Sequence, residues 1–338
     1  MMSLKQYIKL ILLNAGVLRL KQMTLPRSAV ILYYHSVSKD RMGQAPWITP
    51  AITVDAEQFR EHMRLLRKNY NPVTVEEIAE WIRGKRTLPP KSVAISFDDG
   101  FLDNAELAAP IMEEFGIRGT FYLTVDCIMR QELPWFCKIH NLFHHADLEK
   151  RVLHDIESRQ TWDFTDPKQR RAAFLYLSYP CARYSGDVLS RRIEEIEMLF
   201  GYRCDSENAP KMMSFEHARE LRKRGHIIGC HTFSHGNMAH IPVKDLHREI
   251  VEAANILAKE LGEPVKHFSY PHPCLDPQWS EESLNITRKY GFESTVLTHF
   301  GIITTKSNPM LLNRISIGNF DIDSFRWKLE MAFAGIKT

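Results

Sequence analysis

Short apolar runs that favour β-strands alternate with amphipathic segments that favour helices along most of the chain. The strands are predicted at Ala29–Tyr34, Val93–Phe97, Thr120–Val125, His226–Cys230, Val265–Ser269 and near 294–298. Helices are predicted between them, at about 55–68, 74–83, 104–115, 215–224, 243–261 and 281–290. Repeated strand–helix units indicate an α/β protein with a parallel sheet, either open or closed into a barrel. In both forms functional residues collect at the carboxyl ends of the strands.

The alternation stops between about Cys127 and Pro210. This stretch is rich in His, Arg and aromatic residues, and its pattern is mainly helical with breaks at prolines. We expect an insertion here rather than an independent domain, because the repeated β-prone runs of the flanking regions are missing. The predicted organisation is an N-terminal segment at 1–27, a first barrel part at 28–126, a helical insertion at 127–210 and a second barrel part at 211–338.

Composition and charge exclude few functions. The chain has 338 residues, of which 44% are hydrophobic, so a packed core is expected and disorder is not. A net charge of +3 is too small to argue for nucleic-acid binding. The six cysteines form no Cys-x-x-Cys pair and are interpreted as reduced thiols of a cytoplasmic protein; three disulfides in an exported protein are the alternative.

The N-terminal segment at 1–27 is apolar only in short pieces. The run Ile8–Leu13 is interrupted by Lys9 and followed by Asn14, so it is too short to span a membrane. No small-x-small cleavage site follows it, so an export signal is not predicted. We expect an amphipathic helix that packs on its own domain or contacts the inner face of the membrane. The predicted location is the cytoplasm.

Two polar motifs directly follow predicted strands. Asp98 and Asp99 come after Val93–Phe97, and His231 and His235 come after His226–Cys230. Taken alone, Asp-Asp-Gly is typical of a solvated turn, and a His pair at this spacing is typical of a surface or a helix cap. Taken together, one carboxylate and two imidazoles form a ligand set for Zn²⁺ or a similar ion with an open coordination position. The other carboxylate is free to act as a base, which favours metal-assisted hydrolysis.

His35 also follows an apolar strand, Ala29–Tyr34. It is interpreted either as a core histidine with a satisfied ring or as a general acid, because histidine can hold a proton near neutral pH.

These motifs carry a family resemblance. Ser96–Gly100 resembles the first motif of the polysaccharide deacetylases (the NodB-homology, carbohydrate esterase 4 group), and His231–His235 resembles their H-[ST]-x-x-H motif. Phe268–Pro271 is similar to their third motif. Tyr34–Val37 resembles the circularly permuted branch, in which the acid histidine precedes the Asp-Asp motif. The resemblance implies a distorted (β/α)7-type barrel, here with a mainly helical insertion, and a divalent metal. Zinc is the expected metal, with Co²⁺, Ni²⁺ or Mn²⁺ as alternatives.

The resemblance also implies a role for each matching residue. The metal ligands would be Asp99, His231 and His235, the base would be Asp98, and the acid that protonates the departing amine would be His35. His299 in Leu297-Thr298-His299 superficially matches the Leu-x-His motif of unpermuted members and is the alternative acid.

The third motif departs from the family pattern. It contains no arginine, so the group that orients Asp98 is not identified from the sequence. Pro273 stands where the family has glycine and removes a backbone N–H. The expected oxyanion donor is a backbone N–H near His272. The predicted substrate-binding residues are Tyr270, Pro271, His272 and His299.

The predicted activity is therefore metal-dependent N-deacetylation. The substrate would be an N-acetylhexosamine in a glycan, a lipid-linked saccharide or a nucleotide sugar of surface-polysaccharide biosynthesis. Two alternatives remain: a related amide hydrolase acting on a non-sugar acyl compound, and a non-catalytic glycan-binding protein that kept the fold.

Overall fold

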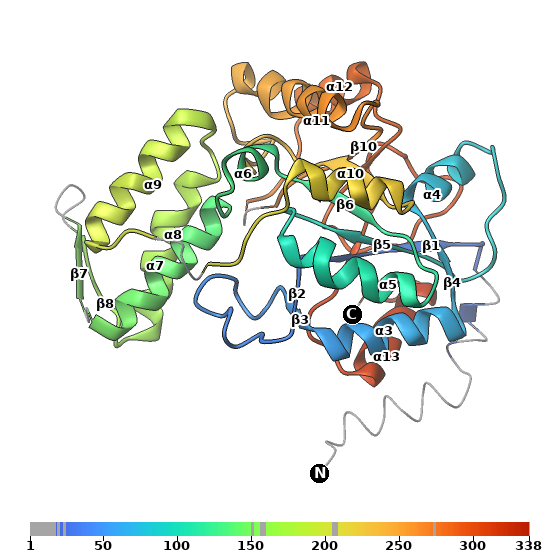
Figure 1. Ribbon diagram of the computed structural model, residues 1–338, viewed down its shortest axis with the longest axis horizontal. Helices are drawn as coiled ribbons and strands as arrows, with labels where there is room; N and C mark the ends of the chain where they lie inside the picture. The colour runs from blue at the N-terminus through green and yellow to red at the C-terminus, as the bar shows by residue number, and fades with distance from the viewer. Residues whose placement is uncertain are drawn as a thin grey trace, which may run out of the picture.

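The computed structural model describes residues 18, 21–22, 25–149, 152–155, 160–204, 209–272 and 275–337. The predicted amphipathic segment at 1–27 lies almost wholly outside the described residues, as do Pro273 and Cys274. Figure 1 shows a curved central sheet wrapped by helices, with a helical lobe to one side of it. The five described cysteines are free thiols. Among the described residues, no helix combines the length and the apolar character that crossing a membrane requires.

The central sheet is parallel throughout and has eight strands. Its order is β11 (Ser294–Val296), β10 (His267–Ser269), β9 (Ile227–Cys230), β6 (Thr120–Leu123), β5 (Ser92–Phe97), β1 (Ala29–Tyr34) and β12 (Ile315–Ser316), with β4 (Asn71–Val73) also beside β5. Leu312 bridges to Val296 of β11, and β12 pairs with β1. The segment 312–316 therefore links the two ends of the sheet and closes it into the distorted (β/α) barrel that the family resemblance implies.

Helices cover the outside of this barrel, and amphipathic periodicity fixes the face that each one buries. They are α3 (Ala56–Asn69), α4 (Val75–Ile82), α5 (Ala109–Glu114), α10 (Phe215–Lys223), α11 (Ala253–Leu261), α12 (Glu281–Tyr290) and α13 (Ile322–Phe333). In α4, Thr74 and Glu77 form the capping box that their spacing predicts.

Two of the predicted helices are irregular at their amino ends. The helix predicted at 104–115 begins with the π-helical turn η1 (Asn104–Ala108). The helix predicted at 243–261 consists of a 3₁₀ turn η2 (Val243–Asp245), a π-helical turn η3 (Arg248–Glu252) and then α11. π-Helical turns are rare and frequently occur at functional sites. The hydrophobic periodicity of the sequence does not reveal these π-helical turns, because one extra residue in a turn shifts the apolar face of the helix only slightly.

The insertion has its own hydrophobic cluster. The helices of this region are α6 (Val125–Arg130), α7 (Trp135–Glu149), α8 (Pro167–Cys181) and α9 (Gly186–Phe200). Figure 1 shows α7, α8 and α9 packed together beside the barrel. Buried side chains from these three helices, including Ile139, Leu177 and Ile193, form the cluster. The antiparallel pair β7 (Val152–Asp155) and β8 (Gln160–Asp163) was not expected. Its strands are short and half polar, so they carry little β signal.

A second small sheet lies near the end of β1. It pairs β2 (Ser36–Ser38) with β3 (Thr53–Asp55) in parallel. β2 follows His35 directly, so the chain is held on both sides of that residue.

His62 makes the stability of the barrel depend on pH. The ring is fully buried, stacks on Phe325 with 3.9 Å between centroids, and places Nε2 2.8 Å from the carbonyl oxygen of Phe320. Burial lowers the pKa of His62 to about 4, whereas an unfolded histidine titrates near 6.5. Between these values the unfolded chain binds a proton that the folded chain does not. The free energy of unfolding therefore falls as the pH is lowered through this window, by about 3 kcal/mol for this group.

We expect urea denaturation at pH values from about 6.5 down to about 4.5 to show a steeper loss of stability in wild type than in His62→Gln. His267 is also buried with a pKa lowered to about 4, so part of the slope remains in the variant. Equal slopes in the two proteins would contradict the assignment to His62.

Candidate functional site

Strand register brings the predicted motifs to one edge of the barrel. Tyr34 pairs with Phe97 across β1 and β5, and the Asp98 N–H donates to the Tyr34 carbonyl at 3.1 Å. His35 and Asp98 therefore leave neighbouring strands at the same level. The His231 N–H donates to the Leu123 carbonyl at 2.9 Å, which places His231 at the same carboxyl edge. The edge that the sequence predicts for function is where these side chains meet.

Both motifs turn through the left-handed region of backbone conformation. The φ angles are +76° at Asp99, +90° at Gly100, +66° at Thr232 and +61° at His235. Glycine adopts such angles freely, but the other three residues are strained by them, the β-branched Thr232 most of all. Strain of this kind persists only where surrounding contacts impose it, and it is concentrated at functional sites.

Asp99, His231 and His235 form a group that could hold a metal ion. Their ligand atoms all lie within 4.8 Å of one another, and all three side chains are buried. Asp99 Oδ1 is 3.5 Å from His231 Nε2 and 3.3 Å from His235 Nε2. Atoms that share a tetrahedral ion at about 2.0–2.1 Å are separated by about 3.4 Å, so the spacing fits. Within the described chain, neither carboxylate oxygen of Asp99 has a hydrogen-bond partner of good geometry.

The tautomer of His231 also suits metal binding. Nδ1 lies 2.9 Å from the Ser269 carbonyl, which can only accept, so Nδ1 carries the proton. The lone pair is then on Nε2, the atom that faces Asp99. A histidine ligand normally has this type of second hydrogen bond, which fixes its ring orientation. The centroid of the His235 ring lies 4.8 Å from that of the Phe136 ring of the insertion. The backbone carbonyl of His235 accepts from the Trp135 indole N–H at 3.2 Å.

The pKa values in this group reflect opposing effects of burial and charge. Burial raises the pKa of Asp99, but the facing imidazoles of His231 and His235 outweigh it and hold the pKa well below its usual range. Burial lowers the pKa of His235. For His231, burial is outweighed by attraction to Asp98 and Asp99, and the pKa is raised. The carboxylate of Asp99 is therefore ionised at neutral pH, as a metal ligand requires.

Asp98 is held by a buried arginine that the sequence analysis missed. Arg314 Nη1 donates to Asp98 Oδ1 at 2.7 Å and Nη2 donates to Oδ2 at 2.6 Å, a bidentate pair with both partners buried. Burial raises the pKa of Asp98, and the charge of Arg314 overcomes this and lowers it. Oδ2 also lies 4.0 Å from His231 Nε2. Asp98 is thus ionised, fixed in orientation and adjacent to the possible metal group.

Arg314 orients Asp98, a role for which the third motif of this chain supplies no arginine. It lies between Leu312 and Ile315 in the segment that closes the barrel, outside the motif where the family places its arginine. Its Nη2 also donates to Ser269 Oγ at 2.9 Å, so it reaches the third motif from the opposite side. The signal available in the sequence was that Arg314 is the only charged residue between Lys306 and Asp321.

His35 lies within electrostatic reach of both carboxylates. Its positive form lowers the pKa of Asp98 and of Asp99. Its backbone carbonyl accepts from the Asn104 side-chain amide at 2.7 Å, and Asn104 begins the π-helical turn η1. The structure therefore brings His35 to the same site as the two aspartates.

The predicted substrate-binding residues differ in burial, and Tyr270 lies in the core. The Tyr270 side chain is fully buried and its hydroxyl is 3.0 Å from Thr287 Oγ1 on α12, so it packs in the core and is not available to a substrate. This corrects the expectation for its side chain. Its N–H donates to the Val296 carbonyl, and Pro271 has no N–H, which leaves His272 as the next backbone donor.

His272 and His299 meet at the surface. Asp276 Oδ1 lies 3.2 Å from His272 Nε2 and 3.7 Å from His299 Nε2, and Asp276 is largely exposed. His299 therefore faces Asp276. The His299 carbonyl accepts from the Arg314 N–H at 2.9 Å, so this cluster lies near the end of the barrel that carries the site.

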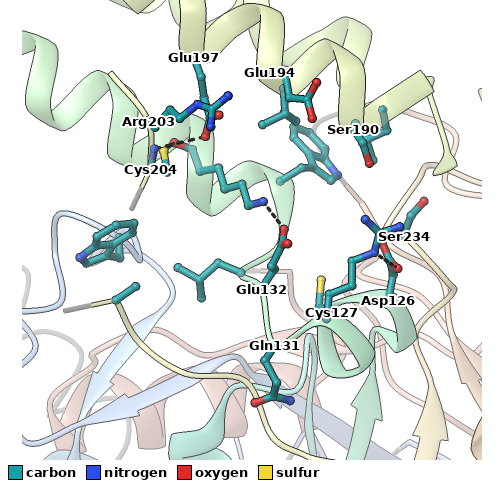
Figure 2. Close-up of a pocket in the computed structure, with 18 of the residues that line it drawn as sticks. Asp126, Cys127, Gln131, Glu132, Ser190, Glu194, Glu197, Arg203, Cys204 and Ser234 are labelled. Atoms are coloured by element: carbon teal, nitrogen blue, oxygen red, sulfur yellow. Dashed lines mark hydrogen bonds and ion pairs between the residues drawn. The ribbon is translucent and has the colours of Figure 1, made fainter. Parts of the chain in front are cut away.

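A polar cavity of about 880 Å³ lies between the insertion and the barrel. Figure 2 shows Asp126 and Cys127 of α6 on one side and Ser190, Glu194 and Glu197 of α9 on the other. Acidic and basic side chains both line it, and Glu132 pairs with Lys138 within it. Ser234 of the His231–His235 motif also lines it, so the insertion and the possible metal group share a boundary.

The carboxyl edge of the parallel sheet thus carries one carboxylate and two histidines that could hold a metal ion. The family model for polysaccharide deacetylases matches residues 201–295, which include the His231–His235 motif. Among curated proteins, YxkH of Bacillus subtilis (strain 168), whose name places it among the polysaccharide deacetylases, is 24% identical over 177 residues. The poly-β-1,6-N-acetyl-D-glucosamine N-deacetylase of Escherichia coli (strain K12) is 32% identical over 87 residues.

Solved structures show the same fold. The deacetylase PplD of Streptococcus pyogenes, in complex with acetate, has a TM-score of 0.56 at 15% identity, with 87% of this chain and 94% of that chain covered. IcaB from Ammonifex degensii has a TM-score of 0.56 at 16% identity, with 91% and 97% covered. The chain is therefore similar to polysaccharide deacetylases in sequence over part of its length and in fold over most of it. The matches cover 48% and 25% of this chain, but only 60% of YxkH and 12% of the Escherichia coli protein, less than two thirds of either relative.

Proposed function

We propose that this protein is a metal-dependent N-deacetylase that removes acetyl from an N-acetylhexosamine of a surface glycan or its precursor. The observation that supports this most directly is the group of Asp99, His231 and His235 beside the buried Asp98–Arg314 pair. The same edge of the barrel thus combines a possible metal site, an oriented carboxylate and a histidine.

Each residue of the site has a distinct role in this proposal. Asp99, His231 and His235 hold a divalent ion, with zinc the first choice for two imidazoles and one carboxylate. When bound, such an ion polarises a carbonyl and makes water a better nucleophile near neutral pH. Asp98 accepts the proton of the attacking water, and Arg314 keeps its carboxylate in one orientation. A carboxylate oxygen has two lone pairs, so the bond from Arg314 leaves Asp98 able to accept this proton.

The departing amine needs a proton, because an amide nitrogen is a poor leaving group until it is protonated. His35 donates it, from the end of the strand next to that of Asp98. The oxyanion of the tetrahedral intermediate is stabilised in part by a backbone N–H of the third motif, for which His272 is the candidate. Its side chain and that of His299 line the approach of the sugar in this proposal.

The substrate class rests on the relatives. The Escherichia coli relative is named for the N-deacetylation of poly-β-1,6-N-acetyl-D-glucosamine. We therefore propose an N-acetylated sugar as the substrate, as part of a glycan, a lipid-linked saccharide or a nucleotide sugar.

We expect purified protein reconstituted with Zn²⁺ to release acetate from at least one member of a panel of such substrates. Mass spectrometry would show the product lighter by one acetyl group replaced by hydrogen. Treatment with a chelator should abolish the release, and added Zn²⁺ or Co²⁺ should restore it, because the carboxylate and imidazoles alone provide no Lewis acid. Small non-sugar amides serve as the comparison arm. Turnover of these amides alone, or turnover that survives complete removal of metal, would contradict the proposal.

A further inference from the structure

Glu249 is a buried carboxylate whose partners all belong to the loop that carries the two histidines. It lies in the π-helical turn η3 and is fully buried. Its Oε2 accepts the backbone N–H of Phe233 at 3.1 Å and that of Ser234 at 2.9 Å. Its Oε1 accepts the Ser234 hydroxyl at 2.6 Å. The predicted roles of the motif residues do not include this carboxylate, which is distant from the motif in the sequence.

The Thr232 side chain connects Glu249 to a proposed metal ligand. It lies beside the Glu249 carboxylate and opposes the rise in the pKa of Glu249 that burial causes. The Thr232 hydroxyl oxygen accepts the backbone N–H of His235 at 2.9 Å. The carboxylate therefore holds the two central residues of the loop directly and its last residue through one side chain.

The loop needs such support because its backbone is strained. Thr232 and His235, with φ of +66° and +61°, flank the two N–H groups that Glu249 binds. A buried carboxylate without partners is strongly unfavourable, so Glu249 is stable only while the loop presents these donors. Conversely, the left-handed conformation at Thr232 persists only while an acceptor holds the adjacent amides. The conformation of the loop and the position of the carboxylate are therefore coupled.

We propose that Glu249 is a positioning residue that fixes the 231–235 loop in the conformation in which His231 and His235 face Asp99, and that it thereby sets the affinity of the site for its metal. This inference rests on the proposed metal site. Glu249 itself does not touch the metal or the substrate. Loss of the carboxylate lets the loop relax, and the two imidazoles must then be reordered each time a metal binds.

The expected effects differ among substitutions that keep or remove the acceptor. Glu249→Ala removes it, and the dissociation constant for Zn²⁺ should rise by about ten- to a hundredfold, the range found for residues that orient ligands. Glu249→Asp is one methylene shorter and cannot hold both amides at once, so it should also weaken binding by about tenfold or more. Glu249→Gln keeps an oxygen for the two amides and should bind within about threefold of wild type.

Zinc affinity should be measured by competition with a chromophoric chelator, together with the melting temperature before and after zinc is added. The rise in melting temperature relative to the metal-free form of the same variant reports the stabilisation that zinc binding adds. Glu330→Ala is a matched control. Glu330 is a partly buried glutamate of α13, with 13% of its side chain exposed, and it accepts from Tyr70 at 2.6 Å and from Lys91 at 2.9 Å, at the amino ends of β4 and β5.

The control should lower the melting temperature of the metal-free protein and leave the zinc-induced rise unchanged. If Glu249→Ala fails to fold, Glu249→Asp and Glu249→Gln carry the test. Unchanged zinc affinity in Glu249→Asp, or an equal loss in Glu249→Gln and Glu249→Ala, would overturn the positioning role. Failure of the wild-type protein to bind zinc would instead refute the proposed metal site, so the two failures are distinguishable.

Discussion

Asp98→Asn is expected to lower kcat for acetate release by about 10²–10⁴, the range that a positioned general base contributes, while the protein keeps its zinc. The introduced amide has the size of the carboxylate but cannot take a proton from water. The proposed ligands Asp99, His231 and His235 are unchanged. A large loss of turnover at constant metal content is the expected signature of a base that is not a ligand.

Asp99→Asn is the matched comparison, because it makes the same chemical change in the adjacent residue. An amide is a poor zinc ligand, so this variant should lose zinc as well as activity. Elemental analysis after dialysis and initial rates on the substrate identified for wild type would be measured for both variants. Near-normal turnover in Asp98→Asn, or loss of zinc from it, would refute the division of roles between the two carboxylates.

The position of the site could be predicted from the sequence because short strands carry strong local signals. The apolar runs that end at Tyr34, Phe97 and Cys230 are each followed at once by a polar motif. In a parallel sheet the carboxyl ends of strands lie at one edge, so local pattern alone indicated that His35, Asp98 and His231 would meet. No contact between distant residues had to be known for this step.

The residues that hold the site in place could not be predicted in the same way. Arg314 and Glu249 act through contacts with residues far away in the sequence, and neither lies in a motif with its own spacing. The bidentate bond of Arg314 depends on the segment that closes the barrel, which has only the two-residue strand β12 as a local signal. Glu249 depends on a π-helical turn, which periodicity cannot detect.

Tyr270 shows the opposite error, in which a motif residue was given a role that its orientation excludes. Alternation along a strand decides whether a side chain faces the interior or the helices, and a shift of one residue reverses it. The strand β10 ends at Ser269, which contacts Asp98 and Arg314. The next side chain points the other way, toward Thr287 on α12. Motif identity alone did not contain this information.

Arg314→Met is expected to produce the largest loss of stability among the changes considered, about 3–5 kcal/mol in the free energy of unfolding. The Asp98 carboxylate would stay buried after losing its two strong donors, and its other hydrogen-bond partner, Ser269 Oγ, is 3.4 Å away. Asp98→Asn should cost less, because the guanidinium of Arg314 keeps the Leu297 carbonyl at 2.9 Å and Ser269 Oγ as acceptors. Urea denaturation of both single variants would measure this asymmetry.

The double variant Arg314→Met with Asp98→Asn separates the ion pair from the packing of the long side chain. Once the carboxylate is gone, the missing guanidinium no longer leaves a buried charge alone, so the double variant should be more stable than Arg314→Met by about 1–3 kcal/mol. Arg314→Lys keeps the charge but not the two-pronged donor, and should lie between wild type and Arg314→Met in both stability and kcat. If the two single losses of stability simply add, the buried pair is not coupled. The orientation of Asp98 would then have to come from the strand β5 and the turn at Gly100 instead.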